Sequence, residues 1–358
     1  MQRRQLFLPI CCAVFFVLSI PASARSWKAA VQLIYPEGEA YVLNDGRVFA
    51  PAIDYLHPGS QIWNPANNTW TALPNMQYVR FSSATVVLKD GRVLVTGGLS
   101  GSTVLNNAEI YDPVTNSWTL SSSVMTTARY QHRATKLKDG RILIVGGCLS
   151  YGCGAGAKQA EIYDPTTDTF RATGSLNLNT TAFTSNLLQN GAVLITGETT
   201  TAEVYNPKSG KWVFGGNMAM NRVFHAATSL SNGKVLVTGG SDSNGALLNT
   251  AELFDPATRS WKQVGNMSAV REQHATIPVP GGKALIAGGM SIIRDMYVVL
   301  NTTEVFDSAT GNFTPMVPMM KERVDFGLVA LPSGHAMAVG GDYYVIEHGF
   351  YPGDAEIY

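Results

Sequence analysis

A short segment recurs seven times along this chain of 358 residues. Each copy has an apolar run, a two-residue turn of the Asp-Gly or Asn-Gly kind or a variant, and a second run rich in β-branched residues. Such turns need positive φ, which Gly adopts readily and Asn or Asp tolerates, so each copy predicts a β-hairpin. The copies are EAYVLNDGRVFAPA (39–52), SATVVLKDGRVLVTGG (83–98), RATKLKDGRILIVGG (133–147), TSNLLQNGAVLITGE (184–198), ATSLSNGKVLVTGG (226–240), ATIPVPGGKALIAGG (275–289) and GLVALPSGHAMAVGG (327–341).

A second signature follows each hairpin. It reads SQIWNP (60–65), AEIYDP (108–113), AEIYDP (160–165), AEVYNP (202–207), AELFDP (251–256), TEVFDS (303–308) and AEIY (355–358). About five residues after the first six copies stands a large aromatic: Trp70, Trp118, Phe170, Trp212, Trp261 and Phe313. The repeat therefore predicts strand a, a tight turn, strand b ending in a glycine pair, strand c with the Glu-x-aromatic, an Asp-Pro turn, and strand d.

A four-stranded unit repeated at 42 to 52 residues is typical of a β-propeller blade. These motifs closely resemble the kelch repeat over essentially all of the chain beyond its first 24 residues. The resemblance implies an all-β fold, a seven-bladed kelch-type β-propeller in residues 25–358. Blade units are expected at about 36–75, 80–124, 129–176, 180–218, 222–267, 271–319 and 323–358.

The seventh unit ends at Tyr358 with strand c, so its strand d must come from elsewhere. WKAAVQLIY (27–35) begins with an aromatic, as the other strands d do, and precedes the first strand a. We expect it to close the last blade, which removes an exposed sheet edge and is similar to ring closure in the galactose oxidase central domain.

The first 24 residues predict a cleaved signal peptide. Arg3 and Arg4 precede an apolar run from Leu6 to Ile20, and PASA ends at Ala24. We expect cleavage after Ala24 and a secreted or periplasmic protein, with the general or the twin-arginine export route both open. No later segment has the length of a membrane span.

The net charge of zero and the 15% of charged residues disfavour a nucleic-acid partner. Once the signal is removed, Cys148 and Cys153 are the remaining cysteines. In an oxidising compartment, two cysteines five apart in a Gly-rich loop predict a local disulfide.

The connections between strands b and c differ greatly in length, whereas the a–b and c–d turns are short and uniform. Antiparallel order puts the b–c and d–a connections on the same face of the disk, which we call the b–c/d–a face. Variable loops on a rigid scaffold usually carry binding. Tyr343 and Tyr344 in the long seventh connection, like Tyr151 and Tyr297 in others, are candidate contacts for a sugar ring or a protein.

Eleven residues before each turn glycine stand Tyr35, Arg80, Arg129, Thr180, Arg222, Arg271 and Arg323. In kelch propellers that bind acidic peptides, arginines at the start of strand a line the mouth of the channel, and these match by position. A guanidinium can donate two parallel hydrogen bonds to a carboxylate, sulfate or phosphate. The candidate ligand-binding residues are therefore Arg80, Arg129, Arg222, Arg271 and Arg323. The other interpretation is that they pair with neighbouring acids such as Glu272, Glu322 and Asp325 and only fix the spacing of the blades.

Two further sets repeat with the blades. His132, His225 and His274 follow three of the arginines at a fixed distance, which favours packing over a three-His metal site. The Glu of strand c recurs six times, which favours a buried structural carboxylate over catalysis, because catalysis needs one distinct site. We expect no metal and no catalytic residues.

The galactose oxidase resemblance would imply copper, but this chain has no Tyr-His dipeptide and both remaining cysteines lie in the same loop. Copper oxidase activity and cofactors are therefore not expected. The favoured function is an exported monomeric binding or interaction protein that engages a glycan or an acidic protein segment. The alternatives are a metal-free mutarotase or epimerase on an acidic sugar, similar to the six-bladed kelch sialic acid mutarotases, and an assembly role in a cell-envelope complex.

Overall fold

The computed structural model describes residues 26–30, 32–33, 38–51, 59–154, 156–341, 344–345, 349–350 and 354–358. Within these ranges every regular element is a strand, and none forms a helix long and apolar enough to cross a membrane. The predicted signal peptide (1–24) lies outside the described residues.

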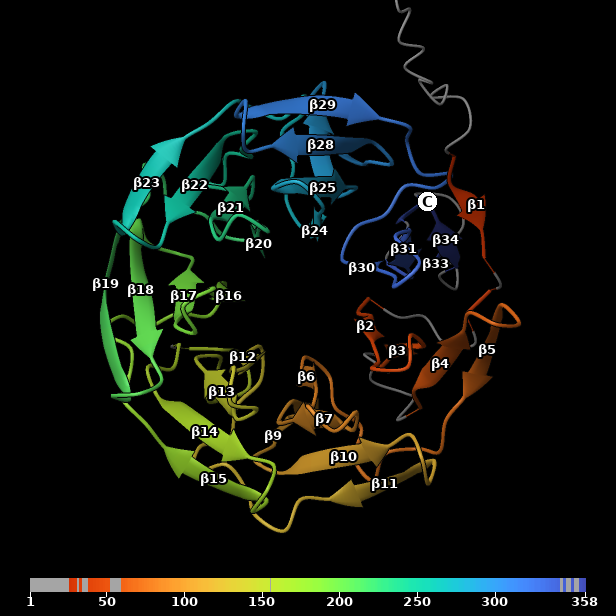
Figure 1. Cartoon of the computed structure of the whole chain (residues 1–358), viewed down its shortest axis with the longest axis vertical. Coiled ribbons are helices and arrows are strands. Elements are labelled where there is room, and N and C mark those ends of the chain that lie inside the picture. Colours follow the sequence, from red (N-terminus) through yellow and green to blue (C-terminus); the bar gives the residue numbers. More distant parts are fainter. Residues whose placement is uncertain are drawn as a thin grey trace, which may run out of the picture.

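Seven four-stranded antiparallel sheets are arranged in a ring (Figure 1). The first three blades contain β2 (Tyr41–Val42), β3 (Val48–Ala50), β4 (Gln61–Asn64) and β5 (Thr69–Ala72); β6 (Ala84–Val87), β7 (Val93–Thr96), β10 (Ala108–Asp112) and β11 (Ser117–Leu120); and β12 (Arg133–Lys136), β13 (Ile142–Val145), β14 (Ala160–Asp164) and β15 (Thr169–Ala172).

Blades four to six contain β16 (Thr184–Leu187), β17 (Val193–Thr196), β18 (Thr201–Asn206) and β19 (Lys211–Asn217); β20 (Ala226–Ser229), β21 (Val235–Thr238), β22 (Ala251–Asp255) and β23 (Ser260–Gln263); and β24 (Ala275–Val279), β25 (Lys283–Ala287), β28 (Thr303–Asp307) and β29 (Asn312–Met316). Blade seven contains β30 (Gly327–Ala330), β31 (Ala336–Val339), β34 (Ala355–Ile357) and β1 (Lys28–Ala29).

Blade seven confirms the predicted ring closure. The N-terminal β1 pairs antiparallel with β34, with Lys28 opposite Ile357 and Ala29 opposite Glu356. The ring of Trp27 lies 5.3 Å from that of Tyr358. The same contact joins strands c and d in other blades, for example Tyr205 and Trp212 at 5.0 Å. The regular strand is shorter than the predicted segment 27–35.

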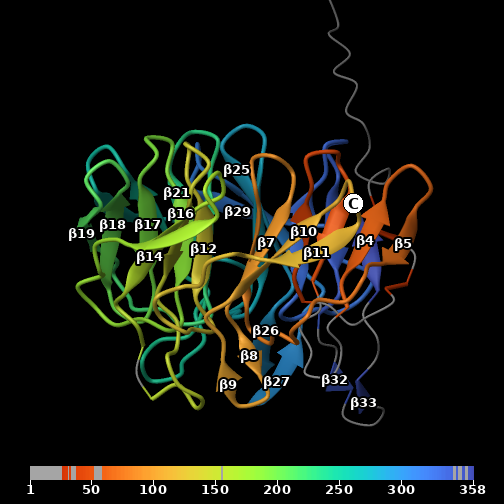
Figure 2. The same ribbon diagram turned by 90° about the horizontal axis from the view of Figure 1, so that it is seen from below.

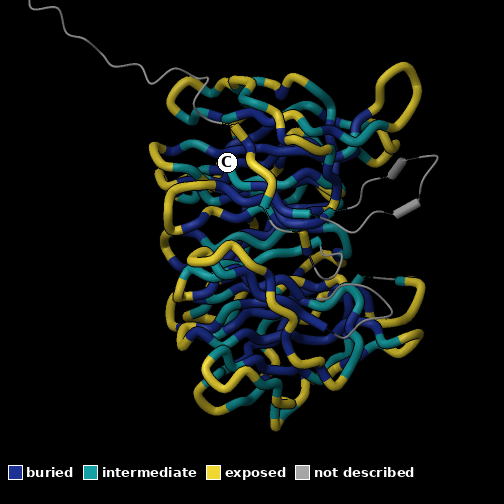
Figure 3. The backbone as a smooth tube through the Cα atoms, turned by 90° about the vertical axis from the view of Figure 1, so that its right-hand side faces the viewer, coloured by how far each residue is buried: buried dark blue, intermediate teal, exposed yellow. Residues whose placement is uncertain are grey.

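The hydrophobic core lies between neighbouring blades. Leu94 and Ile110 of blade two pack with Ile142 and Tyr163 of blade three, and the other blade pairs repeat this pattern. Strand b is buried along its whole length in β7, β13, β17, β21 and β31, because a neighbouring blade covers each of its faces. Figure 3 shows buried backbone through the disk and exposed loops at its surface.

Candidate functional site: the b–c/d–a face

The b–c connections project from one face of the disk (Figure 2). Three of them form hairpins of their own: β8 (Leu99–Ser100) with β9 (Thr103–Val104), β26 (Met290–Ile293) with β27 (Met296–Val299), and β32 (Tyr344–Val345) with β33 (Gly349–Phe350). Blade four has only the four residues 197–200 at this place. The scaffold is therefore uniform, whereas this face differs from blade to blade.

The b–c connection of blade three contains the predicted disulfide between Cys148 and Cys153, with a Cα–Cα distance of 5.0 Å. Cys148 is fully buried, and its backbone pairs with that of Tyr130 in the d–a connection. The disulfide therefore fixes the base of an exposed loop against the disk.

The five candidate arginines are buried rather than exposed at the face. Arg129, Arg222 and Arg271 are 0% exposed, Arg80 is 1% exposed and Arg323 is 3% exposed. Each guanidinium contacts the strand-c glutamate of its own blade at 2.7–3.1 Å, in the pairs Arg80–Glu109, Arg129–Glu161, Arg222–Glu252, Arg271–Glu304 and Arg323–Glu356. Burial lowers the pKa of Arg80, Arg129, Arg222 and Arg271, but arginine stays protonated in proteins.

Each arginine also binds backbone oxygens. In blade six, Arg271 Nη1 donates to the carbonyl of Gly288 at 2.8 Å and to that of Thr302 at 3.3 Å, while Nη2 donates to Glu304 at 2.7 Å. The first glycine of the pair and the residue two before the glutamate accept in the same way in the other four blades. The guanidinium thus links the ends of strands b and c to the segment that enters strand a.

The paired glutamates hold the chain segment that arrives from the preceding blade. Glu109 accepts the backbone N–H groups of Gln77 and Tyr78 at 2.7 and 3.1 Å, and Glu161 accepts those of Thr126 and Thr127 at 2.7 and 3.2 Å. This geometry agrees with a structural role for the carboxylate. It also favours the structural interpretation of the arginines, so their role in ligand binding stays an untested prediction that burial does not support.

The other two candidate binding residues lie at the edge of what can be described. Tyr343 is outside the described residues, and Tyr344 is described only as part of the backbone of β32. Their proposed contact with a ligand stays a prediction.

The three histidines are buried and each contacts a threonine at the end of strand b. His132 Nε2 lies 2.8 Å from Thr96 Oγ1, His274 Nε2 lies 2.8 Å from Thr238 Oγ1, and His225 Nε2 lies 3.1 Å from Thr196 Oγ1. Each threonine belongs to the preceding blade. Burial, followed by the nearby arginines, lowers the pKa of His132 and His274 well below the usual value and that of His225 to about 3.

These histidines predict a loss of stability in acid. Because the folded-state pKa is lowered, the unfolded chain binds more protons below pH of about 6.5, and stability falls as the pH falls. The expected slope is about 1.4 kcal/mol per pH unit for each histidine. Melting temperatures measured from pH 8 to pH 4 should be nearly constant above pH 7 and then fall. His274→Phe, which copies Phe183 and Phe326 at the equivalent place, should reduce the slope; an unchanged slope would contradict the assignment.

The described residues do not fit a copper centre. They contain no group of three or more His, Cys, Asp or Glu side chains placed to hold a metal ion. His132, His225 and His274 come from three different blades and point at threonines within the blade interfaces. No chemistry through copper can be derived from these residues.

The sequence analysis singled out Tyr151 and Tyr297 on the b–c/d–a face but missed the exposed apolar side chains of Ile293 and Met296 beside Tyr297. Ile293 is 53% exposed, Met296 63% and Tyr297 63%, all on the β26–β27 hairpin, and Tyr151 of the disulfide loop is 66% exposed. Of the large apolar residues exposed within the described ranges, all but Val114, Leu120 and Phe214 lie in b–c or d–a connections. The length of the connection in blade six was the sequence signal for this hairpin.

The fold and the repeated blade place this chain among the seven-bladed β-propellers. The family model described as "Kelch motif" matches residues 80–125 and 222–268. An Arabidopsis thaliana protein described as an F-box/kelch-repeat protein is 30% identical over 142 residues, which are 39% of this chain and 36% of that protein. This chain is thus a seven-bladed β-propeller that carries kelch motifs at residues 80–125 and 222–268.

Among solved structures, a fungal alcohol oxidase of the AA5 family in complex with copper is similar, with a TM-score of 0.76 and 20% identity. The match covers 93% of this chain and 75% of the oxidase. At this identity the likeness concerns the fold alone. The match to the plant relative spans little more than a third of that protein's length, so it supports the repeat and not a whole-protein activity.

Proposed function

We propose that this propeller is a protein-interaction module that binds a partner polypeptide through the b–c/d–a face. The observation that carries the proposal is the concentration of exposed apolar side chains on that face, chiefly Ile293, Met296 and Tyr297 on the β26–β27 hairpin. Exposed apolar residues gathered in one region are typical of protein interfaces. The kelch repeat supports the same class of function.

The finer expectations, a glycan or an acidic protein segment as ligand, depended on an exposed arginine row. Because those guanidinium groups are buried in ion pairs, a polypeptide partner that buries apolar surface has the better support. Tyr151 and Tyr297 are exposed and have the large flat rings that such interfaces favour.

We also propose that the protein is exported and acts outside the reducing cytosol. The proposal is carried by the signal-peptide pattern of residues 1–24, in which two arginines precede an apolar run and the segment PASA. The Cys148–Cys153 disulfide supports it, because such bonds persist in oxidising compartments. The mass of the protein recovered from its host should correspond to a chain that begins at Arg25. Recovery of the uncleaved chain from the cytosol would overturn the proposal.

Site-specific photo-crosslinking tests the interaction face. A benzophenone amino acid at position 297 or 151 should capture the same polypeptide from host extract, whereas one at position 114, exposed on the opposite face, should not. The double variant Ile293→Ser with Met296→Ser should weaken capture from position 151 without lowering the melting temperature. Equal capture from position 114, or capture that the double variant leaves unchanged, would refute the proposed face.

A further inference from the structure

Among the described residues, five blades share a buried pair between an arginine and the strand-c glutamate, and blade four lacks this arginine. Thr180 stands in the arginine place, but the strand-c glutamate is retained as Glu203. Blade one differs, because it has the neutral Gln61 at the glutamate place. Blade four therefore keeps the acceptor set without an arginine at the matching position.

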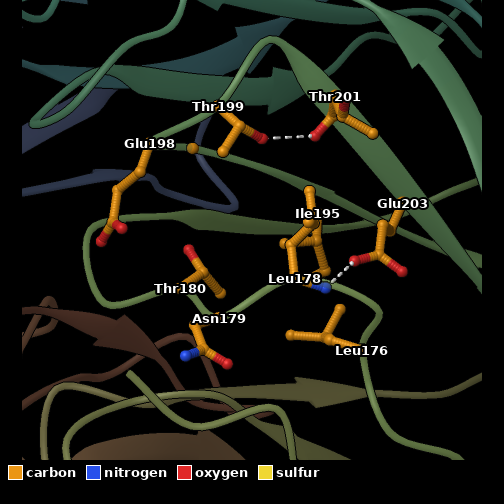
Figure 4. Close-up of a pocket in the computed structure, with 10 residues that line it drawn as sticks. Leu176, Leu178, Asn179, Thr180, Ile195, Glu198, Thr199, Thr201 and Glu203 are labelled. Carbon is orange, nitrogen blue, oxygen red and sulfur yellow. Dashed lines mark hydrogen bonds between the residues drawn. The ribbon is translucent and has the colours of Figure 1, made fainter. Parts of the chain in front are cut away.

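A small cavity occupies the missing arginine's place (Figure 4). Its lining includes Thr180, Gly197, Glu198, Thr201 and Glu203, which we call the blade-four notch. By repeat spacing, the Gly197 and Thr201 carbonyls correspond to the two backbone oxygens that Arg271 binds in blade six, Gly288 and Thr302. The notch therefore repeats the blade-six acceptors.

Glu203 is 5% exposed, and its carboxylate has only amide donors among the described residues. Asn177 donates its backbone N–H at 3.0 Å and its Nδ2 at 2.5 Å, and Leu178 donates its backbone N–H at 3.0 Å. The backbone contacts repeat those of the other blades, while the neutral Asn177 amide replaces a guanidinium. A buried carboxylate without a counterion is costly, so a cation that enters this place gains a strong electrostatic contact.

A second observation indicates an unfilled polar site. Thr180 is 7% exposed, and its hydroxyl, which lines the notch, has no hydrogen-bond partner within the described structure. Buried polar groups are almost always hydrogen-bonded. Glu198 adds a second carboxylate, although one of its oxygens accepts the backbone N–H groups of Thr181 and Ala182 at 2.7 and 2.8 Å.

The notch opens on the b–c/d–a face because the b–c connection of blade four is so short. Residues 197–200 alone separate strands β17 and β18, so no hairpin projects over the cavity. Two of its carbonyl acceptors already accept one hydrogen bond each. The backbone N–H of Arg222 donates to the Gly197 carbonyl at 3.2 Å, and the Thr199 hydroxyl donates to the Thr201 carbonyl at 3.2 Å. A carbonyl oxygen has two lone pairs and can accept a second donor.

We propose that the blade-four notch binds the guanidinium group of an arginine side chain supplied by a partner polypeptide. The inserted group takes the place that Arg80, Arg129, Arg222, Arg271 and Arg323 occupy in their own blades, with Glu203 as its counterion. This proposal rests on the proposed function, since it names one chemical group of a partner at the same face. It reverses the expected charge preference, because an acidic notch selects a basic residue.

Nα-acetylarginine methylamide is the probe, and its neutral isostere Nα-acetylcitrulline methylamide is the matched control. Amide NMR spectra of the protein should show shifts confined to residues 177–181 and 197–203 with the arginine probe at millimolar concentration. Citrulline should bind at least tenfold more weakly, because it lacks the charge that Glu203 requires. Equal shifts from the two probes would overturn the proposal.

Two variants locate the binding. Thr180→Arg should fill the notch within the chain, raise the melting temperature and abolish the arginine-induced shifts, whereas Ser209→Arg adds the same charge to the opposite face of blade four and should change neither. Glu203→Gln should weaken probe binding at least tenfold, which keeps the test valid if the Thr180 variant does not fold. Binding that persists in Glu203→Gln, or in folded Thr180→Arg, refutes the notch.

These outcomes are separate from the test of the proposed function. If the arginine probe causes no NMR shifts but crosslinking from position 297 is observed, only the arginine-binding proposal is refuted. A probe that binds as expected beside equal crosslinking from position 114 would remove only the partner-binding face.

Discussion

Arg271→Met should lower the free energy of unfolding by about 3–5 kcal/mol, the usual cost of removing one partner of a buried ion pair. The substitution leaves the Glu304 carboxylate, 1% exposed, without the guanidinium that contacts it at 2.7 Å. It also removes the donors to the Gly288 and Thr302 carbonyls. Denaturant unfolding followed by tryptophan fluorescence measures the change.

The double variant Arg271→Met with Glu304→Leu is the control. Replacing both charges by apolar side chains of similar volume often costs little, so the double variant should recover most of the stability that the single variant loses. A single variant within about 1 kcal/mol of the parent chain would contradict the structural role. It would also reopen the interpretation that Arg271 serves a ligand.

Trp27→Ala should lower the free energy of unfolding by about 3–5 kcal/mol, typical for a large aromatic removed from a core. Trp27 is 4% exposed, packs with Met319 and Phe326, and donates its indole N–H to the Val317 carbonyl at 3.2 Å. Because it anchors the two-residue β1, its loss should also release β1 from β34. Unfolding curves and limited proteolysis report these two effects.

Trp70→Ala is the matched control, because Trp70 is equally a strand-d aromatic, 7% exposed, in a blade whose strands are continuous in the chain. It should lose packing energy without early cleavage between blades one and seven. A disulfide joining Cys residues placed at 28 and 357, which lie opposite one another, should rescue Trp27→Ala. Equal proteolysis of the two tryptophan variants, or no rescue, would contradict ring closure by β1.

Most of the fold could be predicted from repeated residues. The turn glycines, the paired strand-c and strand-d aromatics and the seventh unit without its own strand d predicted seven blades and closure by the N-terminal segment, and the structure confirms both. These features are local or periodic, so one misread copy does not alter the interpretation. The bounds of β1 could not be predicted, because they depend on which residues pair with the distant β34: Lys28 and Ala29 lie opposite it, and the Ala30 N–H donates to the Ala355 carbonyl at 2.7 Å.

The candidate site was harder to predict. The arginine row was found by counting from the turn glycine, but its spacing is the same for a guanidinium that faces a ligand and for one that turns inward. The structure decided between them, because each guanidinium is buried against a strand-c glutamate. Spacing could not show this, since each partner lies 29 to 33 residues further along the chain, at Glu109, Glu161, Glu252, Glu304 and Glu356. The notch beside Thr180 likewise became visible only when the structure placed Gly197, Thr201 and Glu203 around it.

The amino-acid sequence by itself determined the architecture of this protein: a β hairpin with a glycine turn, copied seven times, and two chain ends that complete one blade. Only the tertiary structure decided which polar groups are satisfied inside that architecture and which remain open at its surface. The physical reason is that strand formation depends on residues close in the chain. The pairing of a buried charge depends on which side chains the folded blades bring within about 3 Å, and in blade four that leaves Glu203 without its arginine.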